Sequence, residues 1–184
     1  MSVLEFVQVL VSIILALGIA ELLRGWADFL RAESTRPSGL LFALGCWLVL
    51  QHIQFWWIGW RFRDVTTWVF PELLLYVTGP ILLFLAARLL FPQVVEGVDL
   101  GAYYARHGPK VWSLVALFFV VAILVNTLLL DAPLFSSGPI TQAGLILVSL
   151  IARRTTDPWI HTTAIALLIL QLSWRTTLDV VGAG

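Results

Sequence analysis

Three polar side chains lie close together inside an otherwise apolar stretch of this sequence: Gln51, His52 and Gln54. An imidazole can bind or release a proton near neutral pH, and amides both donate and accept hydrogen bonds. An ionisable group deep in a bilayer is costly, so it usually faces the protein interior or water. The trio could therefore take up a proton or contact a solute. The alternative, and the commoner role, is a neutral histidine hydrogen-bonded between helices as a packing contact.

Other polar side chains occur in apolar stretches at helical spacing. Glu5 and Gln8 lie three residues apart near the start of the chain. This spacing is typical of a helix-packing face, and the pair could also line a polar vestibule at one end of a bundle. Asn126 could face the same vestibule. Glu21 and Arg24 have the spacing of a surface ion pair on a helix, which is the simplest interpretation of the Glu21 carboxylate.

The sequence lacks the patterns of several enzyme classes. It contains no GxSG serine motif, no HExxH zinc motif, no phosphate-binding loop and no dinucleotide fingerprint. We expect His52, His107 and His161 at different depths, which argues against a haem held by two histidines. The single cysteine, Cys46, excludes an intrachain disulfide and a cysteine metal cluster. We therefore expect no metal and no cofactor, and an enzyme less than a binding or transport protein.

The composition indicates what kind of elements position these groups. Of the 184 residues, 60% are hydrophobic and only 12% are charged, whereas soluble domains carry about 25% charged residues. So few charges cannot cover a water-facing surface, and we expect most of the surface to contact membrane lipids. The formal net charge of zero argues against nucleic acid as a partner.

The apolar runs predict an all-α fold: a single-domain, polytopic integral membrane protein built as a bundle of six transmembrane helices. A helix needs about 20 apolar residues to cross the hydrocarbon core. The fifth run is the weakest, because it is rich in Ser, Gly and Thr, and it could be partly re-entrant. Pro80, in the middle of the third run, predicts a helix kink. The expected spans are residues 3–23, 40–60, 69–91, 111–130, 135–152 and 158–174.

Positive charges predict how the chain is threaded, because cytoplasmic links are enriched in Arg and Lys. Near the first, third and fifth links the chain has eight such residues: Arg24, Arg31, Arg36, Arg88, Arg106, Lys110, Arg153 and Arg154. The opposite side has three: Arg61, Arg63 and Arg175. These three links are therefore expected in the cytoplasm and both termini outside. The first run lacks the pattern of a secretory signal peptide, so we expect it to be retained as a span.

Aromatic residues and residue usage add two further expectations. Trp56, Trp57, Trp60 and Trp68 fall near the predicted outer interface, where tryptophan is typical of an aromatic belt. The preference for arginine over lysine indicates a GC-rich bacterial genome. Together with the predicted spans, it indicates the bacterial cytoplasmic (inner) membrane.

Three stretches resemble an uncharacterised group of small bacterial polytopic membrane proteins. They are FVQVLVSIILALGIAELLRG, FWWIGWRFRD and LLFPQVVEGVDLGAYY. The similarity covers about the first 110 residues. It implies a membrane protein and transfers neither an activity nor any site residue.

Polar groups inside the spans favour a small channel or transporter for an ion or small solute, in which His52 would tune permeation or take up a proton. The alternative is a non-catalytic membrane subunit or sensor of a larger complex, whose polar groups hold helices together. A lipid-modifying enzyme with scattered residues (Glu21, Arg88, His107 and His161) is a third and weaker hypothesis. The small size of the chain leads us to expect a homo-oligomer or a subunit of a membrane complex.

Overall fold

The computed structural model describes residues 3–63, 65 and 67–181, with side chains up to residue 174. In this part of the chain the secondary structure is all helical, as predicted. Six α-helices and one short 3-10 helix follow one another: α1 (Val3–Arg31), α2 (Gly39–Ile58), η1 (Gly59–Phe62), α3 (Phe70–Leu90), α4 (Leu100–Leu129), α5 (Ser137–Ala152) and α6 (Pro158–Val181).

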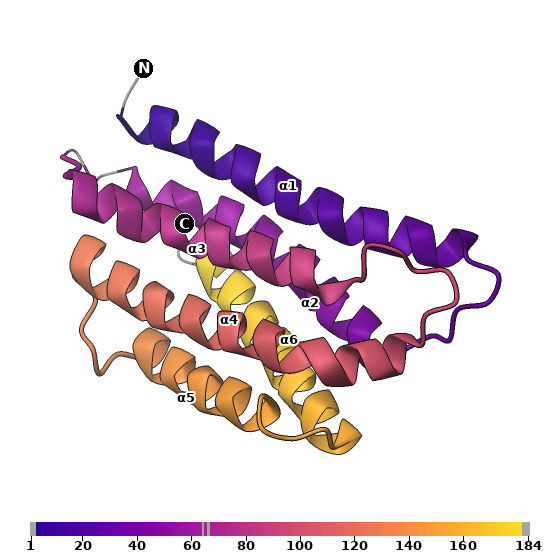
Figure 1. The fold of residues 1–184 in the computed structure, drawn as a ribbon. Coiled ribbons are helices and arrows are strands. Elements are labelled where there is room, and N and C mark those ends of the chain that lie inside the picture. Colours follow the sequence, from indigo (N-terminus) through magenta and orange to yellow (C-terminus); the bar gives the residue numbers. More distant parts are fainter. Residues whose placement is uncertain (1–2, 64, 66, 182–184) are drawn as a thin grey trace.

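The helices form an up-and-down bundle. The links that follow α1 and α3 lie at one end of the bundle, whereas those that follow α2 and α4 lie at the other (Figure 1). α3 packs between α1 and α4, α5 packs mainly against α4, and α6 crosses obliquely to contact α2 and α5. The links alternate between the two ends because they are short, and a short link makes consecutive helices run antiparallel.

Several helices begin at residues that satisfy their free backbone N–H groups. The Ser38 hydroxyl accepts a hydrogen bond from the Leu41 N–H at 3.5 Å at the start of α2. Asp99 caps α4 by accepting from the Ala102 N–H at 3.0 Å. Such caps contribute about 0.5 to 2 kcal/mol each. They set where each helix enters the bundle, because the first turn has no partners within the helix.

Four helical segments are long and apolar enough to cross a membrane: α1, α2 continued by η1, α3 and α4. α5 is apolar but has 16 residues, a length of about 24 Å against a hydrocarbon core of about 30 Å. The chain is therefore a multi-pass membrane protein by helix length and hydropathy. Crossing by α5 and α6 stays a prediction, as does the kink at Pro80, across which α3 is one continuous helix.

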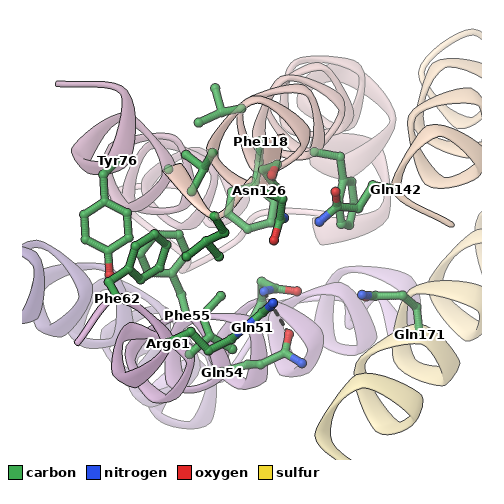
Figure 2. Close-up of a pocket in the computed structure, with 17 residues that line it drawn as sticks. Gln51, Gln54, Phe55, Arg61, Phe62, Tyr76, Phe118, Asn126, Gln142 and Gln171 are labelled. Atoms are coloured by element: carbon green, nitrogen blue, oxygen red, sulfur yellow. Dashed lines mark hydrogen bonds between the residues drawn. The ribbon is translucent and has the colours of Figure 1, made fainter. Parts of the chain in front are cut away.

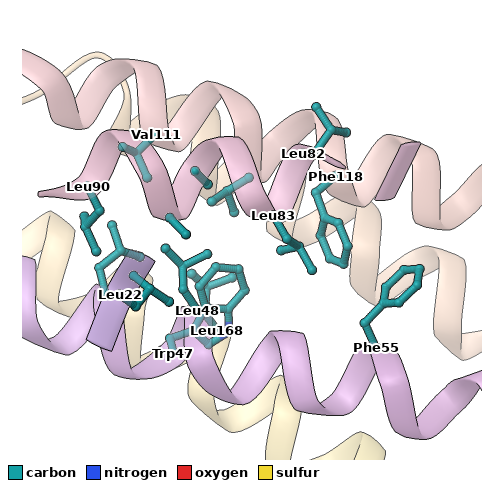
Figure 3. Close-up of a cluster of buried hydrophobic side chains, with 14 of the residues drawn as sticks. Leu22, Trp47, Leu48, Phe55, Leu82, Leu83, Leu90, Val111, Phe118 and Leu168 are labelled. Carbon is teal, nitrogen blue, oxygen red and sulfur yellow. The ribbon is translucent and has the colours of Figure 1, made fainter. Parts of the chain in front are cut away.

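The centre of the bundle is closely packed and dry. Trp47 and Leu48 of α2 are fully buried, and they lie with Leu83 of α3 and Leu168 of α6 in one cluster (Figure 3). In lipid the hydrophobic effect does not drive helices together, so close side-chain packing has to hold such a cluster. Large apolar side chains cover the outside of the helices, as lipid contact requires.

A set of hydrogen bonds joins the α1–α2 link to the α3–α4 link, and we call it the loop clasp (Glu33–Arg36 with Val95–Leu100). The Glu96 carboxylate accepts hydrogen bonds from the backbone N–H groups of Glu33 and Ser34, each at 3.2 Å, and from the Ser34 hydroxyl. The Thr35 hydroxyl donates to the Val95 carbonyl at 2.7 Å. The clasp therefore holds α2 and α4 at a defined distance from α1 and α3 at this end.

Candidate functional site

Five side-chain amides from four helices converge on one cavity inside the bundle, which we call the amide cavity. Gln51 and Gln54 come from α2, Asn126 from α4, Gln142 from α5 and Gln171 from α6 (Figure 2). The cavity has a volume of about 50 Å³. That is enough for about one or two water molecules, since each water takes up about 30 Å³.

Aromatic side chains form much of the remaining wall of the amide cavity. Phe55 from α2 lines it together with Tyr76 from α3 and Phe118 from α4, whose ring centroids lie 5.5 and 6.2 Å from that of Phe55 (Figure 2). Arg61, in η1, is exposed and also lines the cavity. The cavity therefore lies toward the end of the bundle where α2 and α4 finish, with a cation at its rim.

Hydrogen bonds fix three of the five amides, of which Asn126 donates from Nδ2 to the Ala122 carbonyl within α4 at 2.7 Å. The Gln51 Nε2 donates to Gln54 Oε1 at 3.2 Å, and Gln54 Nε2 donates to the Leu172 carbonyl of α6 at 3.5 Å. Gln51 and Gln54 can interact because residues three apart share a helix face. This chain of bonds connects α2 to α6 along one wall of the cavity. It also leaves the second lone pairs of the amide oxygens available to another donor.

Three amide oxygens at the cavity have no hydrogen-bond partner among the described residues: the Oε1 atoms of Gln51, Gln142 and Gln171. Gln51 and Gln142 are only 4% and 5% exposed. A buried acceptor without a partner costs about 1 to 3 kcal/mol. Each of these oxygens is covered by protein atoms on all sides, so a molecule in the cavity can reach it only if the side chain moves.

His52 lies outside this cavity. Its ring is fully buried, and Nδ1–H donates to the Leu48 carbonyl at 2.7 Å. The other ring nitrogen, Nε2, points at Gly18 of α1, where a β-carbon would overlap the imidazole. His52 therefore fills the space between α1 and α2 at Gly18. Its hydrogen bond to Leu48 stays within α2, and Nε2 has no partner among the described residues, so the predicted hydrogen bond between helices is not seen.

Gln8 supports the wall of the amide cavity without lining the cavity itself. Its Nε2 donates to the Tyr76 hydroxyl at 3.4 Å, and its amide occupies the space where Gly59 lacks a side chain. Gln8 therefore holds Tyr76, which lines the cavity. Glu5 is exposed near the start of α1 and is not among the residues that line the cavity.

Glu21 takes part in an ion-pair cluster that links two helices. It accepts hydrogen bonds from Arg24 at 2.6 Å and from Arg88 of α3 at 2.9 Å. The pairing with Arg24 follows from the helical spacing, whereas Arg88 comes from a distant part of the sequence. The predicted ion pair is present, and the Glu21 carboxylate is not among the groups at the amide cavity.

The four tryptophans that were predicted near the outer interface divide into two groups. Trp56, Trp57 and Trp60 are more than half exposed, as expected for side chains that meet an interface. Trp68 is partly buried and packs against Phe62 and Tyr76, with ring centroids 6.1 and 5.7 Å away. Trp68 thus supports the aromatic wall of the amide cavity from outside.

A second buried polar cluster, the Tyr104–Trp112–His161 triad, was not among the groups singled out from the sequence. The Tyr104 hydroxyl donates to His161 Nδ1 at 2.7 Å, and Trp112 Nε1–H lies 3.0 Å from both partners. His161 Nε2–H donates to the Thr155 carbonyl at 3.0 Å. The only sign of this cluster in the sequence was that three aromatic side chains with polar atoms occur in otherwise apolar helices. This triad joins α4 to the start of α6.

Gln142 and Gln171 of the amide cavity were also not predicted as site residues. Each is the one side-chain amide in its span, and nothing in the local pattern shows that it lies near Gln51. Among the residues that the structure describes, no group of three or more His, Cys, Asp or Glu side chains could hold a metal ion.

Comparisons with protein-family models, with curated proteins and with solved structures gave no match for this chain. The similarity to a group of small bacterial membrane proteins therefore stays a resemblance. The class of protein that fold and composition define is a small multi-pass membrane protein of helical type.

Proposed function

We propose that this protein is a small membrane transporter whose solute-binding site is the amide cavity. The observation that carries the proposal is the convergence of five amides from four helices on one cavity. Amides in membrane helices commonly hydrogen-bond from one helix to another, but here five of them gather at a cavity. In this proposal His52 holds helices together and the glutamines contact the solute.

The packing on either side of the cavity favours a transporter over an open channel. Trp47 and Trp112 are fully buried, and Leu48 and Leu83 lie with Trp47 in one packed cluster (Figure 3). A solute that enters beside Arg61 meets this dry core. It can pass only if helices move, as in alternating access around a central site.

The proposal also includes an orientation and a setting. The protein lies in a bacterial cytoplasmic membrane with the loop clasp inside and both termini outside, following the distribution of Arg and Lys. The amide cavity then opens toward the outside, beside Arg61. Membrane lipids surround the bundle, and the protein works as a homo-oligomer or as part of a membrane complex.

The test is solute flux into proteoliposomes that contain the purified protein. We expect uptake of a small polar solute by the wild type and a loss of most of that uptake in Gln51→Leu and Gln142→Leu. Leucine has a similar size to glutamine but cannot form hydrogen bonds. Gln93→Leu is the matched control, because Gln93 is exposed in the α3–α4 link, away from the cavity. Absence of any protein-dependent flux, over a panel of small ions and neutral solutes, would refute the proposal.

The second candidate is a non-catalytic subunit or sensor, and two observations favour it. His52 and Glu21 both serve as contacts between helices rather than as parts of a cavity. A protein whose intramembrane polar groups mainly hold helices together has no need for a solute. Stable co-purification with another membrane protein, together with no flux by the isolated chain, would support this candidate over the transporter.

A further inference from the structure

The basic residues near the loop clasp divide into two sets that differ in their partners. One set pairs with carboxylates of α1 or of the loop clasp: Arg24, Arg31, Arg36 and Arg88. The other set, which we call the basic patch, is exposed on α4 and after α5: Arg106, Lys110, Arg153 and Arg154. In the described part of the chain these four side chains have no ion pair and no hydrogen bond.

We propose that the basic patch binds the headgroups of anionic phospholipids. The proposal goes beyond the proposed function and does not rest on it, because no residue of the patch lines the amide cavity. It requires only that the bundle lies in a membrane, which follows from helix length and hydropathy.

The fold brings the two halves of the basic patch to the same end of neighbouring helices. Arg106 and Lys110 are four residues apart, so they share one face of α4. Arg153 and Arg154 directly follow α5. α5 packs along α4, and at the end that carries the loop clasp α4 extends further than α5 does (Figure 1).

The buried triad fixes the α5–α6 link against this part of α4. The His161 ring accepts from Trp112 Nε1–H of α4 at 3.0 Å, and on its other side it donates to the Thr155 carbonyl at 3.0 Å. Thr155 is the residue after Arg154, and Trp112 is two residues after Lys110. The two halves of the basic patch therefore stay at a similar height along the bundle.

The length of α5 places its basic end at the level of lipid headgroups. Its 16 residues span about 24 Å, whereas the hydrocarbon core is about 30 Å thick. A span shorter than the core is accommodated when the bilayer thins beside it and when flanking basic side chains extend to the phosphates. Arg153 and Arg154 therefore need an anionic partner at that depth, and the described part of the chain supplies none.

Apolar side chains continue from the basic patch along the lipid-facing surface of both helices. Leu117 lies seven residues, or about two turns, after Lys110, and it is 47% exposed. Leu147 and Ile151 are 63% and 56% exposed, and they precede Arg154 at helical spacing. A positive charge that is followed by an exposed apolar surface suits an amphiphile, whose phosphate meets the charge and whose acyl chain covers the leucines. A free anion would use only half of this surface.

The charge of the basic patch is not balanced by nearby carboxylates. Asp157 is the acidic residue of the α5–α6 link, and its Oδ1 accepts from the Trp159 N–H at 2.9 Å. A cluster of Lys and Arg beside membrane helices attracts anionic lipids, and it does so within about a Debye length of the surface. Trp159, 81% exposed next to this link, is typical of a side chain at the membrane interface.

The first test measures which lipid the protein retains. The purified protein is exchanged into detergent micelles with equal amounts of phosphatidylglycerol and phosphatidylcholine, and bound lipids are counted by native mass spectrometry. Both lipids contain a phosphate, but only phosphatidylglycerol has a net negative charge. We expect at least about fivefold preference for phosphatidylglycerol in the wild type. Equal retention of both lipids by the folded wild type would overturn the inference and leave the charges to an acidic protein partner.

Variants assign this preference to the basic patch. Arg153→Gln with Arg154→Gln should lower it by at least about fivefold. Arg31→Gln with Arg36→Gln is the matched control, because it removes the same charge at the same end from residues that already pair with carboxylates. Exposed ion pairs contribute little to stability, so the control should fold and keep its preference. Equal loss in both variants would show that total charge is responsible, and would overturn the inference.

A second patch variant, Arg106→Gln with Lys110→Gln, tests the α4 half in the same assay. It should also lower the preference for phosphatidylglycerol, and it keeps the test decisive if the α5 variant fails to fold. Thermal unfolding in detergent shows which variants are folded. An unchanged preference in every folded patch variant would place the lipid elsewhere and overturn the inference.

A competition experiment separates a lipid from a free anion. Glycerol 1-phosphate, which carries the anionic phosphate without acyl chains, is added in large excess to the protein with bound phosphatidylglycerol. The lipid should stay bound, because its chains also contact the exposed leucines. Full displacement would show that a free anion occupies the patch, and would overturn the inference. Solute flux is measured separately, so a lack of flux would refute the transporter while a preference for anionic lipid still stands.

Discussion

The imidazole ring of His52 lies directly against Gly18, in the space that any larger residue of α1 would fill. The ring is held there by the hydrogen bond from its Nδ1 to the Leu48 carbonyl. This contact allows the backbone of α1 to approach α2 closely, which is the usual role of glycine between membrane helices. The relationship assigns the histidine a place in helix packing and predicts what happens when the glycine gains a side chain.

Gly18→Ala should destabilise the protein by about 1 to 3 kcal/mol, because the added methyl group overlaps the His52 ring. The measurement is the midpoint of thermal unfolding in detergent. Gly144→Ala is the matched control. An added β-carbon there meets no described atom within 4 Å, and alanine favours a helix by about 0.5 to 1 kcal/mol over glycine.

A double variant isolates the contact. In a His52→Ala background the ring is gone, so Gly18→Ala should lose its penalty there. If Gly18→Ala destabilises both backgrounds equally, the overlap with the histidine is not the cause.

The loop clasp should weaken in acid. The hydrogen bond from the Ser34 hydroxyl, helped by the N–H groups of Glu33 and Ser34, lowers the pKa of the Glu96 carboxyl below its ordinary value of 4.5. A depressed pKa means that the unfolded chain binds the proton more readily. The stabilisation is therefore complete above that ordinary value and is lost as the pH falls through the folded pKa.

The corresponding experiment follows the unfolding midpoint in detergent between about pH 6 and pH 3. Glu96→Gln should be less stable than the wild type at the upper end, and the gap should close as the pH falls. Glu33→Gln serves as the control, since Glu33 supplies its backbone N–H to the clasp. A gap that stays constant with pH would show that the Glu96 charge has no part in the clasp.

Loss of His161 should destabilise the protein more than loss of the Tyr104 hydroxyl. His161 Nδ1 is the acceptor that Tyr104 and Trp112 share. In Tyr104→Phe the Trp112 N–H still reaches this nitrogen, so the cost should be about 1 kcal/mol. In His161→Leu the Trp112 N–H keeps the Tyr104 oxygen as its acceptor. The buried Tyr104 hydroxyl loses its acceptor and the Thr155 carbonyl loses its donor, which should cost about 2 to 4 kcal/mol.

Thermal unfolding in detergent measures both triad variants, and the proteoliposome flux assay provides the control. The triad is not among the residues that line the amide cavity, so neither change should lower flux by the folded protein. An equal loss of stability in both variants would contradict the assignment of His161 as the shared acceptor.

Labelling of single cysteines should reveal the threading. In a Cys46→Ser background, a membrane-impermeant thiol reagent applied to intact cells should modify Thr67→Cys and Asp131→Cys, which are exposed in the links after α2 and α4. Gln93→Cys and Arg154→Cys should react only after the cells are opened. Reaction of Arg154→Cys from outside would show that α5 does not cross.

The two glutamines of α2 show what helical spacing alone can predict. Gln51 and Gln54 are three residues apart, so the sequence alone predicts that they share a face and can interact, and they do. His52 follows Gln51 by one residue and is rotated by about 100° around the helix. Because of this rotation His52 faces α1, whereas Gln51 faces the amide cavity. Grouping all three as one polar site was reasonable from the sequence, but the structure separates them.

The sequence by itself determined the class of this protein and its helices. Long apolar runs can satisfy their backbone groups in lipid only as helices, so length and hydropathy were sufficient for α1 to α4. Only the tertiary structure decided which polar residues meet. Gln142 and Gln171 lie far from Gln51 in the chain, and Arg88 lies 67 residues from Glu21. Their convergence depends on how helices rotate and cross, which follows from the packing of all side chains together.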